Sequence, residues 1–215
     1  MSEELYKAMA QTVIDGDDEE AVALARQSLE QGVDPLEAIN QGYTVGMDTV
    51  GELFASGEYF LPDLILGGEA MKAALAVLEP ALHAVGKERE VLGVIVLGSV
   101  KGDIHEIGKS LVGTMLSANG FEVQDLGIDI ESADFVTKAR EYDADIVALS
   151  ALLTTTMLYQ REVVELMAEA GLSGRVKVMV GGSPVTRAWA DQIGAEGFAE
   201  DAATSVVEAR RLMGL

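Results

Sequence analysis

Asp103 and His105 are the residues with the clearest potential for chemistry, because they lie two positions apart in a glycine-rich stretch. The 215 residues of the chain include two histidines and no cysteine. A histidine beside a carboxylate can bind a metal or transfer a proton, and the carboxylate can fix the imidazole tautomer and raise its basicity. Gly102 and Gly108 flank the pair and permit close approach of a ligand to the backbone. This turn is therefore the first candidate for a metal or proton-transfer site.

The same stretch ends in Gly108-Lys109-Ser110, which resembles the end of a phosphate-binding P-loop. Five residues separate Gly102 from Gly108, whereas the P-loop motif has four between its glycines. In addition, no predicted strand ends in the magnesium-binding aspartate of that nucleotide triphosphatase class. The spacing therefore argues against a nucleotide triphosphatase.

The elements that position this turn change character along the chain. Residues 1–82 show the helical spacing of apolar residues, interrupted three times by turn residues, and predict a four-helix bundle. Residues 83–90 lose this periodicity and gather charged residues, which predicts a polar linker. We therefore expect a helical domain over residues 1–86 and a second domain over residues 90–215.

Beyond the linker, short apolar runs alternate with amphipathic ones. This alternation predicts a doubly wound α/β domain with a five-stranded parallel sheet. Ligands of such domains bind beyond the carboxyl ends of the strands, and the Asp103 turn follows the first predicted strand. The predicted strands are 91–97, 121–126, 145–150, 176–180 and 196–199, and the predicted helices are 106–118, 132–141, 155–170, 184–192 and 201–213.

The composition restricts the partners and the compartment. The 36 acidic and 15 basic residues give a formal net charge of -21, which repels nucleic acid and anionic membrane surfaces. The lack of cysteine excludes disulfides and thiolate-bound metal and fits a reducing compartment. The N-terminus lacks the apolar core of a signal peptide, and no run reaches the roughly 18 apolar residues of a membrane span. We therefore expect a cytoplasmic protein with no nucleic-acid or membrane partner.

Several motifs resemble those of a known family. Three of them resemble the signatures of the cobalamin-binding domain of methionine synthase and of the methyltransferase corrinoid proteins, namely Asp103-x-His105-x-x-Gly108, Ser150-Ala151-Leu152 and Gly181-Gly182. Upstream motifs resemble the helical cap module paired with that domain, namely Gly46-Met47-x-x-Val50-Gly51-x-Leu53-Phe54, Phe60-Leu61-Pro62 and Ala70-Met71. The resemblance covers nearly the whole chain and implies a helical cap followed by a Rossmann-like, flavodoxin-like α/β domain.

The resemblance implies a role for each residue of the first motif. In the family, cobalamin binds with its own base off the cobalt and a protein histidine in its place, and that lower axial position falls to His105. Asp103 would be its hydrogen-bonded carboxylate. Thr156 stands where methionine synthase has the serine of a His-Asp-Ser relay, but it reads equally well as the residue that caps the next helix.

The resemblance also implies the residues around the cofactor. Phe54 and Leu61 would cover the upper face of the corrin, although such residues are by default bundle core. Gly181-Gly182 and Phe198–Asp201 would border the buried nucleotide tail, although an ordinary turn and an edge-strand end are the alternatives. The implied cofactor-binding residues are Gly102, Asp103, Ile104, His105, Glu106, Ile107, Gly108, Ser150, Leu152, Thr154, Gly181, Gly182, Phe198, Ala199, Glu200, Asp201, Phe54 and Leu61.

The implied function is that of a corrinoid carrier, which is one subunit of a multi-component methyltransferase. Its cobalamin, methylated in the resting carrier, would cycle between Co(I) and methyl-Co(III). The methyl group would pass from a substrate:corrinoid methyltransferase to a second methyltransferase that uses tetrahydrofolate or coenzyme M, and a reductive activase would serve as a further partner. Residues 83–90 would act as the hinge on which the cap moves aside.

Two alternatives remain open at this level. A cobalamin-binding sensor shares the cap and the fold, but it couples to a DNA-binding or signalling domain for which the 215 residues leave no room. The cobalamin subunit of a mutase shares the Asp-x-His turn, but a helical cap is not its usual partner. No motif specifies the methyl donor, which could be methanol, a methylamine, a methoxylated aromatic compound or a betaine.

Overall fold

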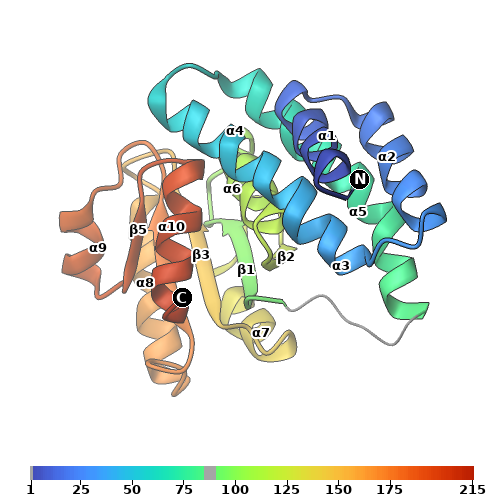
Figure 1. Ribbon diagram of the computed structural model, residues 1–215. Coiled ribbons are helices and arrows are strands. Elements are labelled where there is room, and N and C mark those ends of the chain that lie inside the picture. The colour runs from blue at the N-terminus through green and yellow to red at the C-terminus, as the bar shows by residue number, and fades with distance from the viewer. Residues whose placement is uncertain (1, 85–90) are drawn as a thin grey trace. The chain divides into compact units, whose positions relative to one another are not determined.

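The computed structural model describes residues 2–84 and 91–215, and the chain divides into two compact units, residues 1–90 and 91–215 (Figure 1). Most of the predicted linker, residues 85–90, lies outside the described residues. Its first two positions, His83 and Ala84, belong instead to helix α5 (Leu61–Ala84). The helix therefore runs two residues beyond the predicted end, because backbone hydrogen bonding, rather than apolar spacing, sets where a helix stops.

The first unit is helical, as predicted. Its elements are α1 (Ser2–Asp15), α2 (Asp18–Glu30), then α3 (Pro35–Glu37), the π-helix η1 (Ala38–Tyr43) and α4 (Thr44–Ser56) in one continuous stretch, and α5. Side-chain caps fix two of the starts, since Asp17 accepts from the Glu20 amide and Asp34 accepts from the Leu36 amide, each at 2.9 Å. Gly57 ends α4 in the left-handed conformation.

The helices of this unit pack closely where a glycine faces a neighbouring backbone. A Cβ atom at Gly46 would lie 2.4 Å from the carbonyl oxygen of Ala10 in α1, so the cap motif requires glycine there. Tyr43 is fully buried, and its hydroxyl donates to the Ala21 carbonyl at 2.7 Å. The π-helix that ends at Tyr43 was not predicted, because a widened turn shifts the phase of the apolar pattern without requiring a distinctive residue.

The second unit is an α/β domain, and its parallel five-stranded sheet confirms the predicted class. The strands are β1 (Val94–Ser99), β2 (Glu122–Asp125), β3 (Ile146–Ser150), β4 (Lys177–Gly181) and β5 (Gly197–Ala199). The helices are α6 (Ile107–Ala118), α7 (Ser132–Glu141), α8 (Met157–Glu169), α9 (Arg187–Ile193) and α10 (Ala202–Met213). Within the described residues, no helix has both the length and the apolar character needed to cross a membrane.

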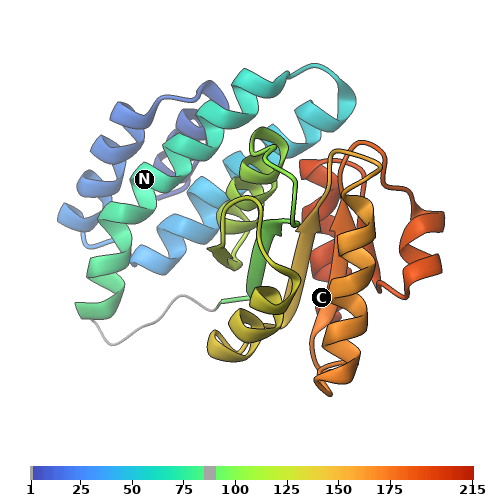
Figure 2. The same ribbon diagram turned by 180° about the vertical axis from the view of Figure 1, so that it is seen from behind.

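The strand order is β2-β1-β3-β4-β5, and every pair is parallel. Helices α6 and α10 pack together on one face of the sheet, and α7, α8 and α9 cover the other, as the two opposite views show (Figure 1, Figure 2). The strand order reverses at β1 and β3, which makes their carboxyl ends the expected ligand-binding edge. Ser99, Ser150 and Gly181 are in register there, at the ends of three adjacent strands.

Candidate functional site

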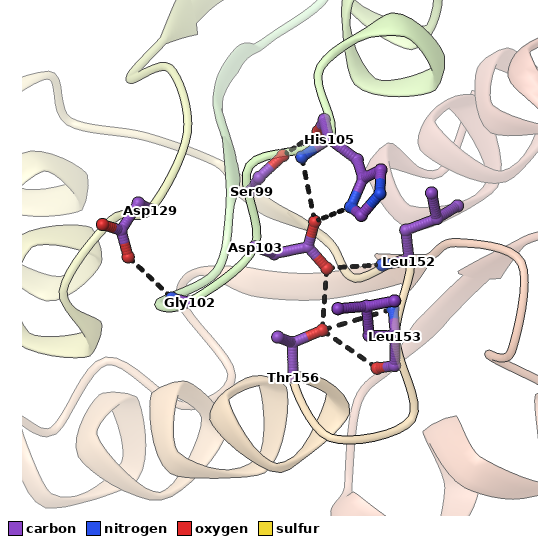
Figure 3. Close-up of polar contacts among 8 residues, drawn as sticks. All are labelled: Ser99, Gly102, Asp103, His105, Asp129, Leu152, Leu153 and Thr156. Carbon is purple, nitrogen blue, oxygen red and sulfur yellow. Dashed lines mark hydrogen bonds and ion pairs between the residues drawn. The ribbon is translucent and has the colours of Figure 1, made fainter.

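The loops that follow β1 and β3 are joined by the carboxylate of Asp103 (Figure 3). This side chain is buried, with 1% of the residue exposed. Its Oδ1 accepts from the His105 amide at 3.1 Å and lies 2.8 Å from His105 Nδ1. Its Oδ2 accepts from the Leu152 amide and from the Thr156 hydroxyl, each at 2.7 Å. One carboxylate from the β1 loop therefore orders both its own loop and the β3 loop.

These contacts keep Asp103 ionised. Burial alone raises the pKa of this carboxyl, but the hydrogen bonds from Thr156, from the Leu152 amide and from His105 outweigh it, and the net pKa lies below the ordinary value of 3.8. A carboxylate that accepts several hydrogen bonds in a buried place is a strong acceptor for an imidazole N–H.

His105 presents the other side of its ring outward. Because Nδ1 faces Asp103, the neutral ring carries its proton on Nδ1 and leaves the lone pair of Nε2 free to bind a metal. The side chain is 45% exposed, so the ring is accessible. The backbone is fixed as well, since the Ser99 hydroxyl donates to the His105 carbonyl at 2.8 Å. The site thus offers one oriented, accessible imidazole nitrogen.

Asp129 also holds the β1 loop, and the sequence analysis missed it. Its carboxylate accepts from the Gly102 amide at 2.6 Å, and its own amide donates to the Asp103 carbonyl at 3.0 Å. Asp129 adopts a φ of 54°, which aspartate tolerates better than most residues. Gly102, with a φ of 75°, completes this tight turn. The residue lies 26 positions from Asp103 in sequence, so no local motif marks it.

Thr156 precedes α8, where the sequence left a relay hydroxyl and a helix cap as equal alternatives. Its side chain makes no capping hydrogen bond to α8. Its hydroxyl instead donates to Asp103 and accepts from the Leu153 amide at 3.3 Å. The geometry therefore favours the relay contact, although the same hydroxyl also lies 2.9 Å from the Leu153 carbonyl oxygen.

Replacing Thr156 with valine is expected to destabilise the 91–215 unit by about 1.5–3 kcal/mol, because it removes a hydrogen bond to a buried carboxylate. The pKa of Asp103 should rise, since this hydroxyl is the strongest of the groups that lower it. Urea unfolding and carboxyl carbon NMR titration measure the two effects. Thr155→Val at the exposed neighbouring position is the matched control, and equal effects of the two substitutions would contradict the assignment.

The two glycines at the end of β4 lie close to neighbouring backbone. A Cβ atom at Gly182, where φ is 122°, would lie 1.9 Å from the Ala151 carbonyl oxygen. A Cβ atom at Gly181 would lie 3.0 Å from the Ala199 carbonyl oxygen. By contrast, a Cβ atom at Gly108 would meet nothing within 4 Å, so no contact within the described residues requires glycine there. A Cβ atom at Gly113 would lie 3.1 Å from Leu97 Cδ2, so Gly113 is a packing contact between α6 and β1.

The other predicted site residues differ in their solvent exposure and in the elements that carry them. Around the Asp103 carboxylate, Ile104, Glu106, Ile107, Leu152 and Thr154 are exposed, and Ser150 is half-buried. At the last predicted loop, Phe198 and Ala199 lie in β5, Asp201 caps α10, and Glu200 is exposed between them. In the helical unit, Phe54 is half-buried in α4 and Leu61 is 37% exposed at the start of α5. Their contacts with a cofactor remain predictions.

Glu208 in α10 anchors the end of β5 and was also missed. Its carboxylate accepts from Arg211, from Arg187 and from the Phe198 amide, at distances between 2.7 and 3.0 Å. The pKa of Glu208 falls from 4.5 to about 2. The hydrogen bond from Arg211 lowers it most and outweighs the opposing effect of burial, and the hydrogen bonds from Phe198 and Arg187 lower it further. Glu208 of α10 thereby fixes the position of β5, the strand that leads to the last loop predicted to border the nucleotide tail.

Glu208→Gln is expected to lower the free energy of unfolding by up to about 3 kcal/mol at neutral pH. The folded pKa is depressed, so the stabilisation is complete above pH 4.5 and is lost as the pH falls through about 2. The difference between variant and native chain should therefore shrink below pH 4.5. Urea unfolding followed by the fluorescence of Trp189 measures it, and a difference that does not vary with pH would contradict this account.

Lys109 is buried in the first turn of α6 and forms an ion pair with Asp125 at the end of β2. The Lys109 side chain is fully buried, whereas that of Asp125 is 38% exposed. Asp125 also accepts from the Gly127 amide at 2.9 Å. In a P-loop this lysine would face a phosphate, so its burial agrees with the argument from spacing. The pair holds α6, which follows the His105 loop directly, against β2.

The donor set at the site suits a metal that another group already holds. His105 supplies one nitrogen, and the buried Asp103 is committed to its hydrogen bonds. Across residues 2–84 and 91–215, no group of three or more His, Cys, Asp or Glu side chains is placed to hold a metal ion. A single axial nitrogen is what a macrocycle-bound metal takes from a protein. The residues therefore fit a corrinoid, in which the ring itself would hold the metal and His105 would add one nitrogen.

Comparisons with known proteins agree with this fit. A B12 binding domain family matches residues 93–207, and a second family of the same description matches residues 5–79. Dimethylamine corrinoid protein 2 of Methanosarcina mazei is 47% identical over 211 residues, which cover 98% of this chain and 98% of that protein. The chain belongs to the B12-binding corrinoid proteins, so the family indicated by the motifs is confirmed.

Two solved structures resemble the chain over nearly its whole length. A cobalamin-binding protein from Desulfitobacterium hafniense DCB-2 has a TM-score of 0.79 and 38% identity, over 95% of this chain and 97% of that one. A chain of the methanol:cobalamin methyltransferase complex from Methanosarcina barkeri has a TM-score of 0.88 and 27% identity, over 98% of this chain and 80% of that one. The helical unit and the Rossmann-like unit thus occur together in these relatives, as the motifs predicted.

Proposed function

We propose that this chain carries a methyl group on a bound corrinoid and works as the corrinoid subunit of a multi-component methyltransferase. The observation that carries the proposal is the His105 imidazole, oriented by the buried Asp103 at the switch point of the sheet. The full-length similarity to a dimethylamine corrinoid protein supports the methyltransferase context over the sensor and mutase alternatives.

His105 would hold the corrinoid through Nε2, as the lower axial ligand of a cofactor bound with its base off the cobalt. When bound, the corrinoid supplies a cobalt that can accept and donate a methyl group. Asp103 fixes the Nδ1–H tautomer and so keeps the lone pair on Nε2, and Thr156 holds the Asp103 carboxylate in place.

The remaining residues would shape and cover the site. Ser150 and Thr154 would hydrogen-bond the nucleotide tail, while Gly181 and Gly182 leave room for it. Phe54 and Leu61 of the helical unit would shield the upper face from water until the unit moves aside.

The partners follow from the role of a carrier. A substrate-specific methyltransferase would deliver the methyl group, and a methylated amine is the first donor to test, because it is named by a relative 47% identical to the chain. A second methyltransferase would pass the group to tetrahydrofolate or coenzyme M, and a reductive activase would restore the reduced cofactor. The proposed setting is the cytoplasm.

The test is methyl transfer with the full chain reconstituted with hydroxocobalamin and reduced. Mixing with dimethylamine and a dimethylamine-specific methyltransferase should change the visible spectrum of the corrinoid, and omitting the methyltransferase should abolish the change. Failure to bind hydroxocobalamin would contradict the proposal. A response limited to light-sensitive binding of adenosylcobalamin would favour the sensor instead.

A further inference from the structure

Gln160 is a fully buried polar residue in α8 that lies below the carboxyl ends of β3 and β4. Its Nε2 donates to the Leu149 carbonyl at 3.0 Å and to the Gly181 carbonyl at 3.1 Å. Its Oε1 accepts from the indole N–H of Trp189 at 2.9 Å. The side-chain amide therefore uses both of its donors and its acceptor within the protein.

The orientation of this amide is fixed by its partners. Two carbonyl oxygens require donors and the indole N–H requires an acceptor, so only one of the two amide orientations satisfies all three. Trp189 lies in α9 and is itself held by the guanidinium of Arg161, which lies 4.9 Å from the ring centroid. The bonds of Gln160 thus tie β3, β4 and α9 together at one point.

This point is where the two strands separate into the proposed tail-binding loops. The Ala151 amide donates to the Gly181 carbonyl at 3.1 Å, and a side chain at Gly182 would collide with the Ala151 carbonyl oxygen. Gln160 adds a second donor to the same Gly181 carbonyl and links it to Leu149. Gln160 therefore adds a side-chain link between β3 and β4 where the two strands end, beside the backbone hydrogen bonds that pair them.

We propose that Gln160 is a positioning residue for the nucleotide tail of the corrinoid, because it donates to a carbonyl near the end of each of the two strands that lead into the tail-binding loops. The inference rests on the proposed function, since it requires that a corrinoid tail enters between these loops. It predicts a selective defect. Loss of the Gln160 hydrogen bonds should weaken binding of a corrinoid that has the nucleotide tail. It should spare binding of a corrinoid that lacks the tail, because the axial contact with His105 is made on the β1 loop.

The test is calorimetric titration of the full chain with hydroxocobalamin and with diaquacobinamide, which lacks the nucleotide tail. Gln160→Met keeps the length of the side chain and removes both donors. It should weaken hydroxocobalamin binding about tenfold or more while leaving cobinamide binding unchanged, since the Leu149 and Gly181 carbonyls each lose a donor beside the tail-binding loops and the β1 loop loses none. Gln192→Met, at an exposed position of α9, is the matched control and should change neither affinity.

Trp189→Phe provides a milder second variant in case Gln160→Met does not fold. It keeps a ring beside Arg161 but removes the N–H that orients the amide, so it should give a smaller loss confined to hydroxocobalamin. Equal losses for both corrinoids, or no loss for either, would overturn the positioning role. If the native chain fails to bind hydroxocobalamin, the proposed function itself is overturned. This binding is measured before any variant is made, so the two failures are distinguishable.

Discussion

Replacing His105 with alanine is expected to weaken corrinoid binding by more than about a hundredfold. Loss of a hydrogen-bonding partner of a metal-bound histidine already costs about 10- to 100-fold in metal affinity, and this substitution removes the ligand itself. Whatever corrinoid still binds should show a visible spectrum changed from that of the native chain, because the axial nitrogen is gone. Absorbance spectra and calorimetric titration with hydroxocobalamin measure both effects.

The chain carries its own control for this experiment. His83 is the only other histidine in the sequence, so His83→Ala removes an imidazole and leaves both Asp103 and His105 in the chain. The His83→Ala chain should keep the native spectrum and affinity. An unchanged Co(III) spectrum in the His105→Ala chain would contradict the assignment of His105 as the axial ligand, whatever happens to the affinity.

Replacing Asp125 with asparagine is expected to destabilise the 91–215 unit by about 3 kcal/mol, near the lower end of the range for a broken buried ion pair. The reason is the asymmetry of burial, because the substitution leaves the fully buried Lys109 ammonium without its counter-charge. Asparagine keeps the size of the side chain and an acceptor for the Gly127 amide. Urea unfolding followed by the fluorescence of Trp189, the only tryptophan, reports on this unit.

Lys109→Met is the matched comparison, because it leaves only the half-exposed Asp125 carboxylate, which water can solvate. It should cost about 1 kcal/mol or less, and the double variant should recover most of the loss caused by Asp125→Asn. If Lys109→Met were the more costly of the two single substitutions, the buried charge would not be the source of the effect.

Much of the fold could be predicted because the signals are periodic. Helical spacing up to residue 82 and alternating strands and helices after residue 90 identify the two architectures without any long-range information. The same alternation placed Asp103 and His105 after the first strand, at the edge where such sheets bind ligands. The chemistry of this turn was therefore visible from residue types and spacing alone.

The residues that support the site could not be predicted in the same way. Asp129, Gln160 and Glu208 are polar residues in loops or helices, where a solvent-exposed side chain is the default expectation. Each acts through a partner that is distant in sequence, such as Gly102 for Asp129. Only the folded backbone brings the partners together. Burial of the polar side chain identifies Gln160 and Glu208, and the exposed Asp129 is identified only by its hydrogen bonds to the β1 loop. A single sequence contains neither signal.

Thr156 illustrates the boundary between the two cases. Its place just before α8 predicted a hydroxyl near the site, but on the sequence evidence that hydroxyl could either donate to Asp103 or accept from an amide of the helix. The short distance to the Asp103 carboxylate arises because the β3 loop folds back toward the β1 loop across adjacent strands. The choice between helix cap and relay is thus a tertiary property.

The most direct test of the account is an electron paramagnetic resonance spectrum of the chain reconstituted with unlabelled cobalamin, reduced to Co(II), after growth with ¹⁵N-labelled histidine. If His105 is the axial ligand, the superhyperfine pattern should be the doublet of a ¹⁵N nucleus, and unlabelled chain should give the triplet of ¹⁴N. A triplet in the labelled chain would show that the cofactor's own base still occupies the cobalt, and it would contradict the central claim that His105 binds there.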